Sequence, residues 1–318
     1  MTSFLIRRLL QAVFVTLFVT VVVFVLLHLL PGGPVRALLP LNASPYQIAH
    51  LTHEYGYDKP LVVQYFTWLG QLLHGNLGYS VHLNMPVSTA IMQRLPKTLV
   101  LMIISTAVAL VLGIPLGLYQ AARRYTAGDY VLTGISFIGY GTPPFFVGLL
   151  LINWLAIDTH MFPAEAPQGN TVAQVLSQPN ALVLPVVTLA FAGYASWSRY
   201  MRSSVMDNLV QDYVRTARAT GASERQVLWR HVFRNSLITI VTLLGLSLPV
   251  LFAGAVVTES VFNYPGLGLL FWQAAQNYDY PILLGTALIG TLATIAGNLL
   301  ADIGYAVLDP RVRYAGDR

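Results

Sequence analysis

One short segment holds a large share of the charge in this chain. The stretch YVRTARATGASERQVLWRHVFRNS, residues 213–236, contains five arginines, although only 10% of the whole sequence is charged and 55% is hydrophobic. A guanidinium group binds anionic groups through short, charged hydrogen bonds. The segment is therefore a candidate binding face, and the elements around it decide what that face can meet.

No comparable set of residues is available for making or breaking bonds. The chain has no cysteine, which excludes disulfides, thiol nucleophiles and thiolate metal sites. Ser, His and Asp form no G-x-S-x-G motif. The only lysines are Lys59 and Lys97, and the ATP-binding motif G-x-x-x-x-G-K-[ST] is absent. We expect no catalytic residue and no metal site, so the chain is not predicted to be an enzyme.

The rest of the composition is typical of a membrane protein. The mean hydropathy is +0.62 over 318 residues. A helix needs about 20 mostly apolar residues to cross the hydrocarbon core of a bilayer. Cutting the sequence at its charges predicts an all-α integral membrane protein with six transmembrane helices, near residues 9–30, 97–119, 131–157, 181–199, 236–258 and 283–305.

The arginines alternate between the connections of these predicted helices. They precede the first span, follow the second and the last, and crowd between the fourth and the fifth, whereas the third-to-fourth and fifth-to-sixth connections have no Lys or Arg. Basic residues accumulate in cytoplasmic loops. We expect a multi-pass protein of the plasma (inner) membrane with both termini in the cytoplasm, and the net charge of +5 then indicates topology rather than nucleic-acid binding.

Residues 31–96 form a predicted extracytoplasmic insertion. Ser44 and Gln47 have the spacing of a helix N-cap, and Leu61, Tyr65, Trp68 and Leu72 fall on one helical stripe. We expect two short amphipathic helices, which serve either as packing elements or as a docking surface for an external partner. The N-terminal apolar run, residues 9–30, is too long for a signal peptide and lacks its cleavage site, so we expect it to be retained as the first span.

Two prolines interrupt the third predicted span. Pro143 and Pro144 each remove a backbone donor and clash with the preceding turn, so they must break or kink the helix. The kink either bends the helix around a pathway or reflects packing alone; the substrate pathway itself is unknown. Two interpretations also stay open for His28, Glu259 and Asp302. Each side chain either takes part in proton or substrate transport, or is a structural residue whose polar group is hydrogen-bonded or hydrated.

The arginine segment is predicted to be a helix, a sharp turn and a second helix. Seven arginines between residues 199 and 235 cannot be buried in lipid, so this region is a cytoplasmic loop. Gly221 suits the left-handed residue after a helix end, and Ser223 with Gln226 forms a capping box for the next helix. By itself, this pattern fits either a partner-binding face or a loop that contacts lipid headgroups.

The segment resembles the cytoplasmic loop of ATP-binding-cassette (ABC) importer permeases. Their Glu-Ala-Ala–Gly signature is replaced here by Arg215-Thr216-Ala217, with Gly221 in register, as in the dipeptide/oligopeptide branch. Similar strings occur along nearly the whole chain, including LPGGPV, YDKPLVVQY, HGNLGYS, RLPKTL, TESVFNYPGLG and DPRVRY. The chain resembles the first of the two permease subunits of such peptide importers.

This resemblance implies a type I ABC importer transmembrane domain, with one N-terminal helix before a five-helix core. The implied organisation is 1–30 for the N-terminal end and first helix, 31–96 for the insertion, 97–308 for the core with its coupling loop 199–235, and 309–318 for a cytoplasmic tail. The implied coupling helix sits in a cleft of a cytoplasmic ATPase. The residues carried over to that contact are Tyr213, Arg215, Ala217, Arg218, Ala219, Gly221 and Ser223.

The implied partners are a second homologous permease, two ABC ATPase subunits or domains, and an extracytoplasmic substrate-binding protein. No cofactor is expected on this chain, because ATP and Mg would bind to the ATPases. The cargo stays open: the same fold also carries nickel, glutathione, haem or oligosaccharides in related systems. An ATPase-independent secondary transporter is a further alternative, although no charge falls at the centre of a predicted span.

Overall fold

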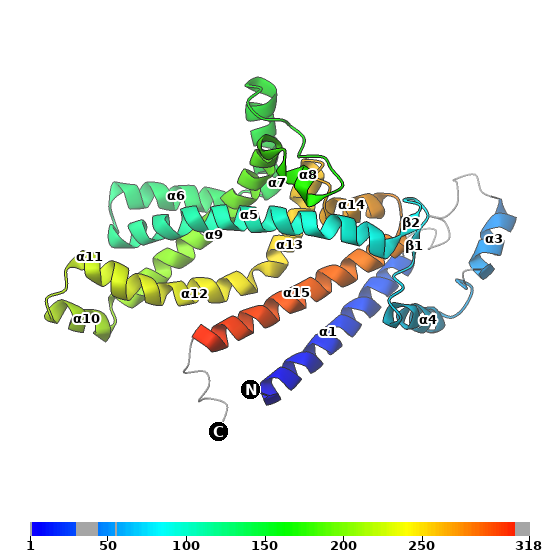
Figure 1. The fold of residues 1–318 in the computed structure, drawn as a ribbon, viewed down its shortest axis with the longest axis horizontal. Helices are drawn as coiled ribbons and strands as arrows, with labels where there is room; N and C mark the ends of the chain where they lie inside the picture. The colour runs from blue at the N-terminus through cyan, green and yellow to red at the C-terminus, as the bar shows by residue number, and fades with distance from the viewer. Residues whose placement is uncertain (1, 30–43, 55, 309–318) are drawn as a thin grey trace. The chain divides into compact units, whose positions relative to one another are not determined.

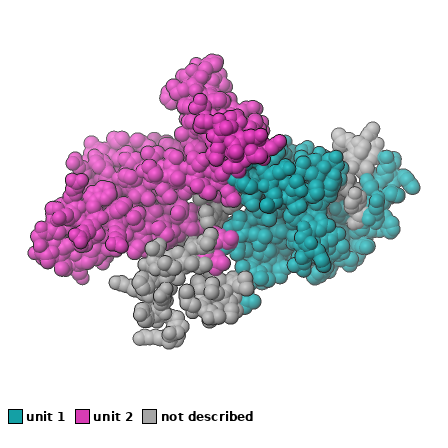
Figure 2. Space-filling model, in the orientation of Figure 1, with its two compact units in different colours: residues 1–98, 265–295 teal, residues 99–264, 296–318 magenta. Residues whose placement is uncertain are grey.

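A computed structural model of the chain describes residues 2–29, 44–54 and 56–308. Within these ranges the regular secondary structure is helical except for one two-stranded hairpin (Figure 1). The chain divides into two compact units (Figure 2): unit 1 comprises residues 1–98 and 265–295, and unit 2 comprises residues 99–264 and 296–318. Helices α5 (Val87–Ala122) and α15 (Tyr280–Leu308) contribute to both units.

Unit 1 is built around the apolar sides of helices from both ends of the sequence. Its other elements are α1 (Thr2–His28), α3 (Pro45–Glu54), α4 (Leu61–Leu73), β1 (Tyr79–Ser80), β2 (Met85–Pro86) and α14 (Leu267–Gln276). The two strands are antiparallel, with Ser80 opposite Met85. Phe24, Ile91, Leu270 and Leu283 lie in the buried core. Ser80 donates a hydrogen bond to the buried Asp279, whose carboxylate also accepts from the N–H of Ile282, so the hairpin is fastened to the start of α15.

Unit 2 contains the central helices of the chain and the arginine segment. Its elements besides α5 and α15 are α6 (Ala127–Gly141), α7 (Pro144–Leu151), the π-helix η1 (Ile152–Asp158), α8 (Val172–Leu176), α9 (Pro179–Leu209), α10 (Asp212–Ala219), α11 (Glu224–Gln226), the π-helix η2 (Val227–Val232), α12 (Phe233–Leu246) and α13 (Leu248–Val261). The long α9 packs against α6, α7 and α12 (Figure 1). Trp197, Met201 and Val205 of α9 lie in one core with Val227 and Ile240.

Helices overlap each of the six spans predicted from the sequence. In the described residues, three helices are long and apolar enough to cross a membrane: Val87–Ala122, Pro179–Leu209 and Tyr280–Leu299. A fourth is added if the bent pair Ala127–Gly141 and Pro144–Asp158 counts as one span. The first and fifth predicted spans correspond to α1 and to α12 with α13, and the total of six stays a prediction. Helix α5 begins at Val87, ten residues before the second predicted span, and so includes residues 87–96 of the predicted insertion.

The third predicted span is broken at its proline pair. α6 ends at Gly141, α7 begins at Pro144, and the two helix segments are bent by 104°. Thr142 has extended backbone angles, as expected for a residue that precedes proline. Beyond the break, Gly148 of α7 packs against the ring of Phe262 and against Val261, so the bend places α7 on the end of α13.

The two predicted helices of the insertion are present as α3 and α4. The hydroxyl of Ser44 accepts a hydrogen bond from the N–H of Gln47 at 3.3 Å, and the Gln47 amide oxygen accepts from the Ser44 N–H at 2.9 Å. This confirms the N-cap. Tyr65 and Trp68 of α4 pack against the core of unit 1, with ring centroids 5.4 and 5.9 Å from that of Phe24.

Small residues bring α5 and α9 into close contact. Ala109, Gly113 and Gly117 recur every four residues on α5 and face α9. A Cβ added at Gly113 would lie 2.9 Å from the Cβ of Trp197, and one added at Gly117 would meet the carbonyl oxygen of Ser198. Such stripes permit the close backbone approach that stabilises helix pairs in membranes.

We predict that Gly117→Ala destabilises the protein and that Gly134→Ala does not. The new Cβ at residue 117 would also lie 2.8 Å from the Cβ of Met201, whereas nothing lies within 4 Å of one at Gly134 on α6. Overpacking of this kind costs about 1–3 kcal/mol. Thermal unfolding of both variants in one detergent measures the difference, and equal midpoints would contradict the close α5–α9 contact.

Candidate functional site

The arginine segment folds into two short helices joined by a sharp turn, which we call the elbow (residues 212–232). α10 supplies the first arm, and α11, continued by η2 and α12, supplies the second. The elbow lies at the end of unit 2 where α9 ends (Figure 1). Asp212 in the first turn of α10 and Arg218 in its last turn both complement the helix dipole.

Backbone and side-chain caps fix the turn between the two arms. Gly221 has φ +85°, a left-handed conformation that other residues resist. The N–H of Gly221 donates to the carbonyl of Arg218 and the N–H of Ala222 donates to that of Ala217, both at 3.0 Å, which is the Schellman pattern. Ser223 and Gln226 then exchange hydrogen bonds at 3.4 and 3.0 Å, and the predicted capping box is confirmed. The angle between the arms is therefore set locally.

The inner side of the elbow is buried in the core of unit 2. Val214 is fully buried, and Ala217 is 8% exposed. The hydroxyl of Tyr213 donates to the side-chain oxygen of Asn208 at 2.6 Å, and the Asn208 amide donates to the hydroxyl of Ser236 on α12 at 3.3 Å. These contacts anchor α10 to both α9 and α12, so the elbow is part of the folded body rather than a loose loop.

The outer side of the elbow presents charge to its surroundings. Arg215 is 74% exposed and has only a long contact of 3.5 Å with the exposed Asp212. Arg218 instead donates twice to Glu224 across the turn, at 2.8 and 3.0 Å. This guanidinium lowers the pKa of the Glu224 carboxyl below its usual range, so the ion pair is complete at neutral pH and is lost only as the pH falls through that lowered value.

The residues predicted for the ATPase contact differ in exposure. Arg215, Arg218, Ala219, Gly221 and Ser223 are exposed, whereas Tyr213 is partly buried. Ala217 is placed differently from the expectation: its small side chain lies in the core of the chain itself, where it allows α10 to approach α9 and α12. The prediction that this residue meets a partner followed from the resemblance, which does not show which side of the helix is covered.

A buried ion pair lies behind the elbow, and the sequence analysis did not identify it. Asp129, at the start of α6, is 2% exposed and accepts two hydrogen bonds of 3.0 Å from the guanidinium of Arg202 on α9. It also accepts from the N–H of Tyr125 at 3.0 Å and from the hydroxyl of Thr133 at 3.3 Å. A buried carboxylate needs such complete pairing. The only sequence signal was an acid at the edge of an apolar span.

Hydrogen bonds extend this ion pair to a third helix. The Gln120 amide of α5 donates to Thr133 at 3.1 Å and accepts from the hydroxyl of Ser198 on α9 at 2.6 Å. Gln120 and Ser198 are both buried. The network joins α5, α6 and α9 two to three turns before α9 ends at the elbow.

The other residues considered for a transport role either have structural partners or are given no role here. Both ring nitrogens of His28 are hydrogen-bonded, to the Phe24 carbonyl at 2.7 Å and to Gln64 at 3.0 Å, which favours its structural interpretation. Glu259 is fully buried and takes part in an interaction. The side chain of Asp302 and the tail 309–318 lie outside the described residues. In the described ranges, no three His, Asp or Glu side chains are grouped to hold a metal ion.

Comparison with known proteins decides the family. Residues 113–314 match the model of the binding-protein-dependent transport system inner membrane component, and residues 1–102 match the N-terminal model of the same kind of component. The chain belongs to this family of ABC importer permeases. It is thus a multi-pass membrane permease subunit and not an enzyme, because in this family the ATPase activity resides on partner subunits.

Curated relatives match this permease over almost its full length. It is 40% identical to the oligopeptide transport system permease protein AppB of Bacillus subtilis, over 99% of this chain and 100% of the relative. It is 39% identical to a putative peptide permease protein of Brucella ovis, over 98% of this chain and 99% of the relative.

Solved structures share the fold of this permease at low sequence identity. An amino acid ABC transporter crystallised with histidines matches with a TM-score of 0.54 and 18% identity, over 69% of this chain and 94% of that one. The inward-facing MetNI methionine ABC transporter matches with a TM-score of 0.53 and 16% identity, over 68% and 96%. These likenesses support the type I importer fold.

We predict that Asp129→Ala destabilises the permease by about 3 kcal/mol, because the variant leaves the guanidinium of Arg202 without its carboxylate in a mostly buried site. Asp207→Ala, which removes an exposed carboxylate from the same helix as Arg202, should have little effect. Arg202→Lys keeps the charge but loses the double hydrogen bond, and should fall between the two. Unfolding midpoints in detergent measure all three, and equal values for the two aspartate variants would contradict a stabilising ion pair.

Proposed function

We propose that this permease is the first of two membrane subunits of an ATP-driven importer for di- and oligopeptides, and that the elbow receives the movement of the ATPase. The observation that carries the proposal is the two-sided construction of the elbow. Its inner side is fixed to the body of unit 2 through Val214 and Tyr213, while Arg215 projects outward. A protruding charged arm on a rigid base suits the transfer of force between two proteins.

The proposed mechanism is alternating access. ATP and Mg bind to two ABC ATPase subunits or domains, whose closure moves the elbows of two homologous permeases together and opens the pair outward. An extracytoplasmic binding protein then delivers the substrate, and hydrolysis resets the assembly. In this proposal both termini and the elbow are cytoplasmic, in agreement with the arginine distribution.

The exposed arginines have different roles in this proposal. Arg215 has no close ion pair among the described residues and is the cation that meets an acidic group of the ATPase. Arg218 is already held by Glu224, so it braces the turn and keeps α10 and α11 at a constant angle. Gly221 and Ser223 support the same angle through their caps.

The peptide cargo is supported by the relatives rather than by a site. AppB is named as an oligopeptide transport system permease, and the Brucella ovis relative as a putative peptide permease. The elbow indicates an ATPase partner but gives no information on the transported substrate. Nickel, glutathione, haem and oligosaccharides therefore remain the alternatives to test.

We predict that Arg215→Glu lowers the affinity of the permease for its ATPase at least about tenfold, because a like charge replaces an interfacial cation. Binding of the purified ATPase to the permease pair in nanodiscs measures this change. Arg124→Glu serves as the control, since it reverses an exposed charge in the α5–α6 connection. An unchanged affinity in Arg215→Glu would contradict the docking role.

Exchanging the charges of Arg218 and Glu224 tests whether Arg218 binds the ATPase or stabilises the turn. Arg218→Glu alone should uncouple ATP hydrolysis from uptake, because two carboxylates then face each other across the turn. Adding Glu224→Arg restores an ion pair of opposite polarity, and we expect coupling to return. Failure of the double variant, in a complex that assembles normally, would assign Arg218 to the partner interface instead.

The cargo is tested with the assembled importer in proteoliposomes. We expect ATP-dependent accumulation of a labelled dipeptide or pentapeptide when the co-purifying binding protein is present, and none when it is omitted. Nickel, glutathione, haem and an oligosaccharide are the parallel substrates. Accumulation of one of these in place of peptide would overturn the cargo while leaving the motor intact.

A further inference from the structure

Helix α4 of unit 1 has three distinct sides, one of which packs against the core of the unit. Tyr65 and Trp68 face the core of the unit. Gln64, Thr67 and Gln71 recur at helical spacing and form a polar stripe. Val62, Phe66 and Leu73 form a second stripe that is apolar and exposed, at 66%, 62% and 80%. A helix of this kind is typical of a membrane interface, where one side meets acyl chains and the other meets headgroups.

The contacts between α4 and α1 indicate how deep α4 lies. Gln64 is hydrogen-bonded to His28 at the end of α1, whereas Tyr65 reaches Thr20, at 3.0 Å between the two hydroxyl oxygens. Thr20 lies eight residues before His28, which is about 12 Å along a helix. Half of a hydrocarbon core is about 15 Å thick. If α1 is the first span, as the sequence predicts, these contacts place α4 at the depth of one leaflet rather than above the membrane.

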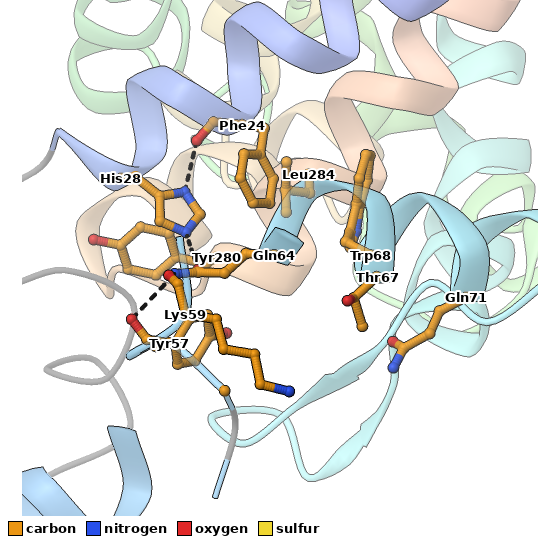
Figure 3. A pocket seen from close by; sticks show the side chains of 11 residues that line it. Phe24, His28, Tyr57, Lys59, Gln64, Thr67, Trp68, Gln71, Tyr280 and Leu284 are labelled. Carbon is orange, nitrogen blue, oxygen red and sulfur yellow. Dashed lines mark hydrogen bonds between the residues drawn. The ribbon is translucent and has the colours of Figure 1, made fainter. Parts of the chain in front are cut away.

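A pocket lies on the polar side of α4. It has a volume of about 200 Å³ and is lined by residues of α1, α4, the start of α15 and the connection before α4, among them Phe24, Trp68, Tyr57, Lys59, Gln71 and Tyr280. The Lys59 side chain extends along this pocket toward Thr67 and Gln71 (Figure 3). No ion pair involves Lys59 in the part of the chain that the structure describes.

One wall of the pocket contains a polar group without a partner. Tyr280 is 4% exposed, and its hydroxyl has no hydrogen-bond partner among the described residues. This hydroxyl is itself inaccessible, so it is not available to a molecule in the pocket. The pocket combines an exposed cation with aromatic walls at the end of α1.

We propose that α4 is an interfacial helix, that its exposed apolar stripe lies among acyl chains, and that the pocket on its polar side binds the phosphate group of a phospholipid. Lys59 supplies the charge that attracts the phosphate, and the side-chain amide of Gln71 donates a neutral hydrogen bond to it. Trp68 and Tyr280 have the amphipathic rings that headgroup regions favour, and Phe24 adds an apolar ring. The lipid holds the insertion helix against α1 and α15. This site does not depend on the cargo or the ATPase.

The depth of α4 is tested by spin labelling, for which the absence of cysteine in the chain is an advantage. Phe66→Cys and Gln71→Cys each place one nitroxide on opposite sides of α4, in the assembled importer in phosphatidylcholine nanodiscs. We expect the label at residue 66 to be accessible to oxygen and shielded from a polar nickel chelate. The ratio of oxygen accessibility to chelate accessibility should be several-fold lower for the label at residue 71. Equal ratios would overturn the interfacial placement. Shielding of residue 66 that appears only on addition of the binding protein would also overturn it, in favour of a protein-docking surface.

The pocket is tested by lipid binding to detergent-solubilised importer. Phosphatidylglycerol is added, and the lipid molecules retained by the complex are counted by native mass spectrometry. Lys59→Gln should retain at least one lipid fewer than the parent, and Lys59→Arg should match the parent. Because Lys59 is exposed, both variants are expected to fold. Equal retention by Lys59→Gln would overturn the phosphate site, as would competition by inorganic phosphate alone, which would indicate a site for the free ion.

Discussion

The structure of unit 2 depends on one buried carboxylate that cannot be left without its cation. Asp129 lies at the start of α6 and is nearly inaccessible to water, so its charge is tolerable only while Arg202 and the surrounding donors stay in place. Separating α6 from α9 would leave both charges without their partner. The two helices are therefore held as one body at the end of α9 from which the elbow projects.

Close packing and helix capping fix further elements to α9 on both sides of this ion pair. Toward the other end of α9, Ala109 and Gly113 let α5 approach so closely that no larger side chain fits between the helices. Toward the elbow, Tyr213 and Asn208 tie α10 to the same body, and Gly221 fixes the turn to the second arm. A displacement imposed on α10 consequently moves α9 and, with it, α5 and α6. Packed interiors respond to such a push by moving as units rather than by deforming.

The sequence was sufficient wherever a local rule determines the structure. The caps at Ser44 and Ser223 and the turn at Gly221 follow from residue type and spacing, because each involves atoms only a few positions apart. The break at Pro143 and Pro144 follows from the missing N–H in the same way. The family resemblance rested on strings along the whole chain, and the comparison at 40% identity agrees with it.

Contacts between residues that are far apart in the sequence could not be predicted from such local rules. Asp129 and Arg202 are separated by 73 residues, and nothing in a single sequence pairs them. The orientation of α10 has the same difficulty: Arg215 and Ala217 are two positions apart, yet one is exposed and the other buried, and only the position of the core shows which is which. The early start of α5 at Val87 was missed because polar residues within a long helix resemble a loop in composition.

The second arm of the elbow shows how a change of helical period alters the result. Val227 and Val232 are both fully buried, although they are five residues apart and would face different sides of a regular α-helix. Between them the backbone forms the π-helix η2, whose wider turn brings residues five apart onto nearly the same side. Both valines can then enter the core that also holds Val214 and Ala217. In a regular α-helix, one of the two valines would be turned away from this core. The π-helix thus joins α12 to the same core as α10, so that a force on either arm of the elbow reaches the body through buried side chains.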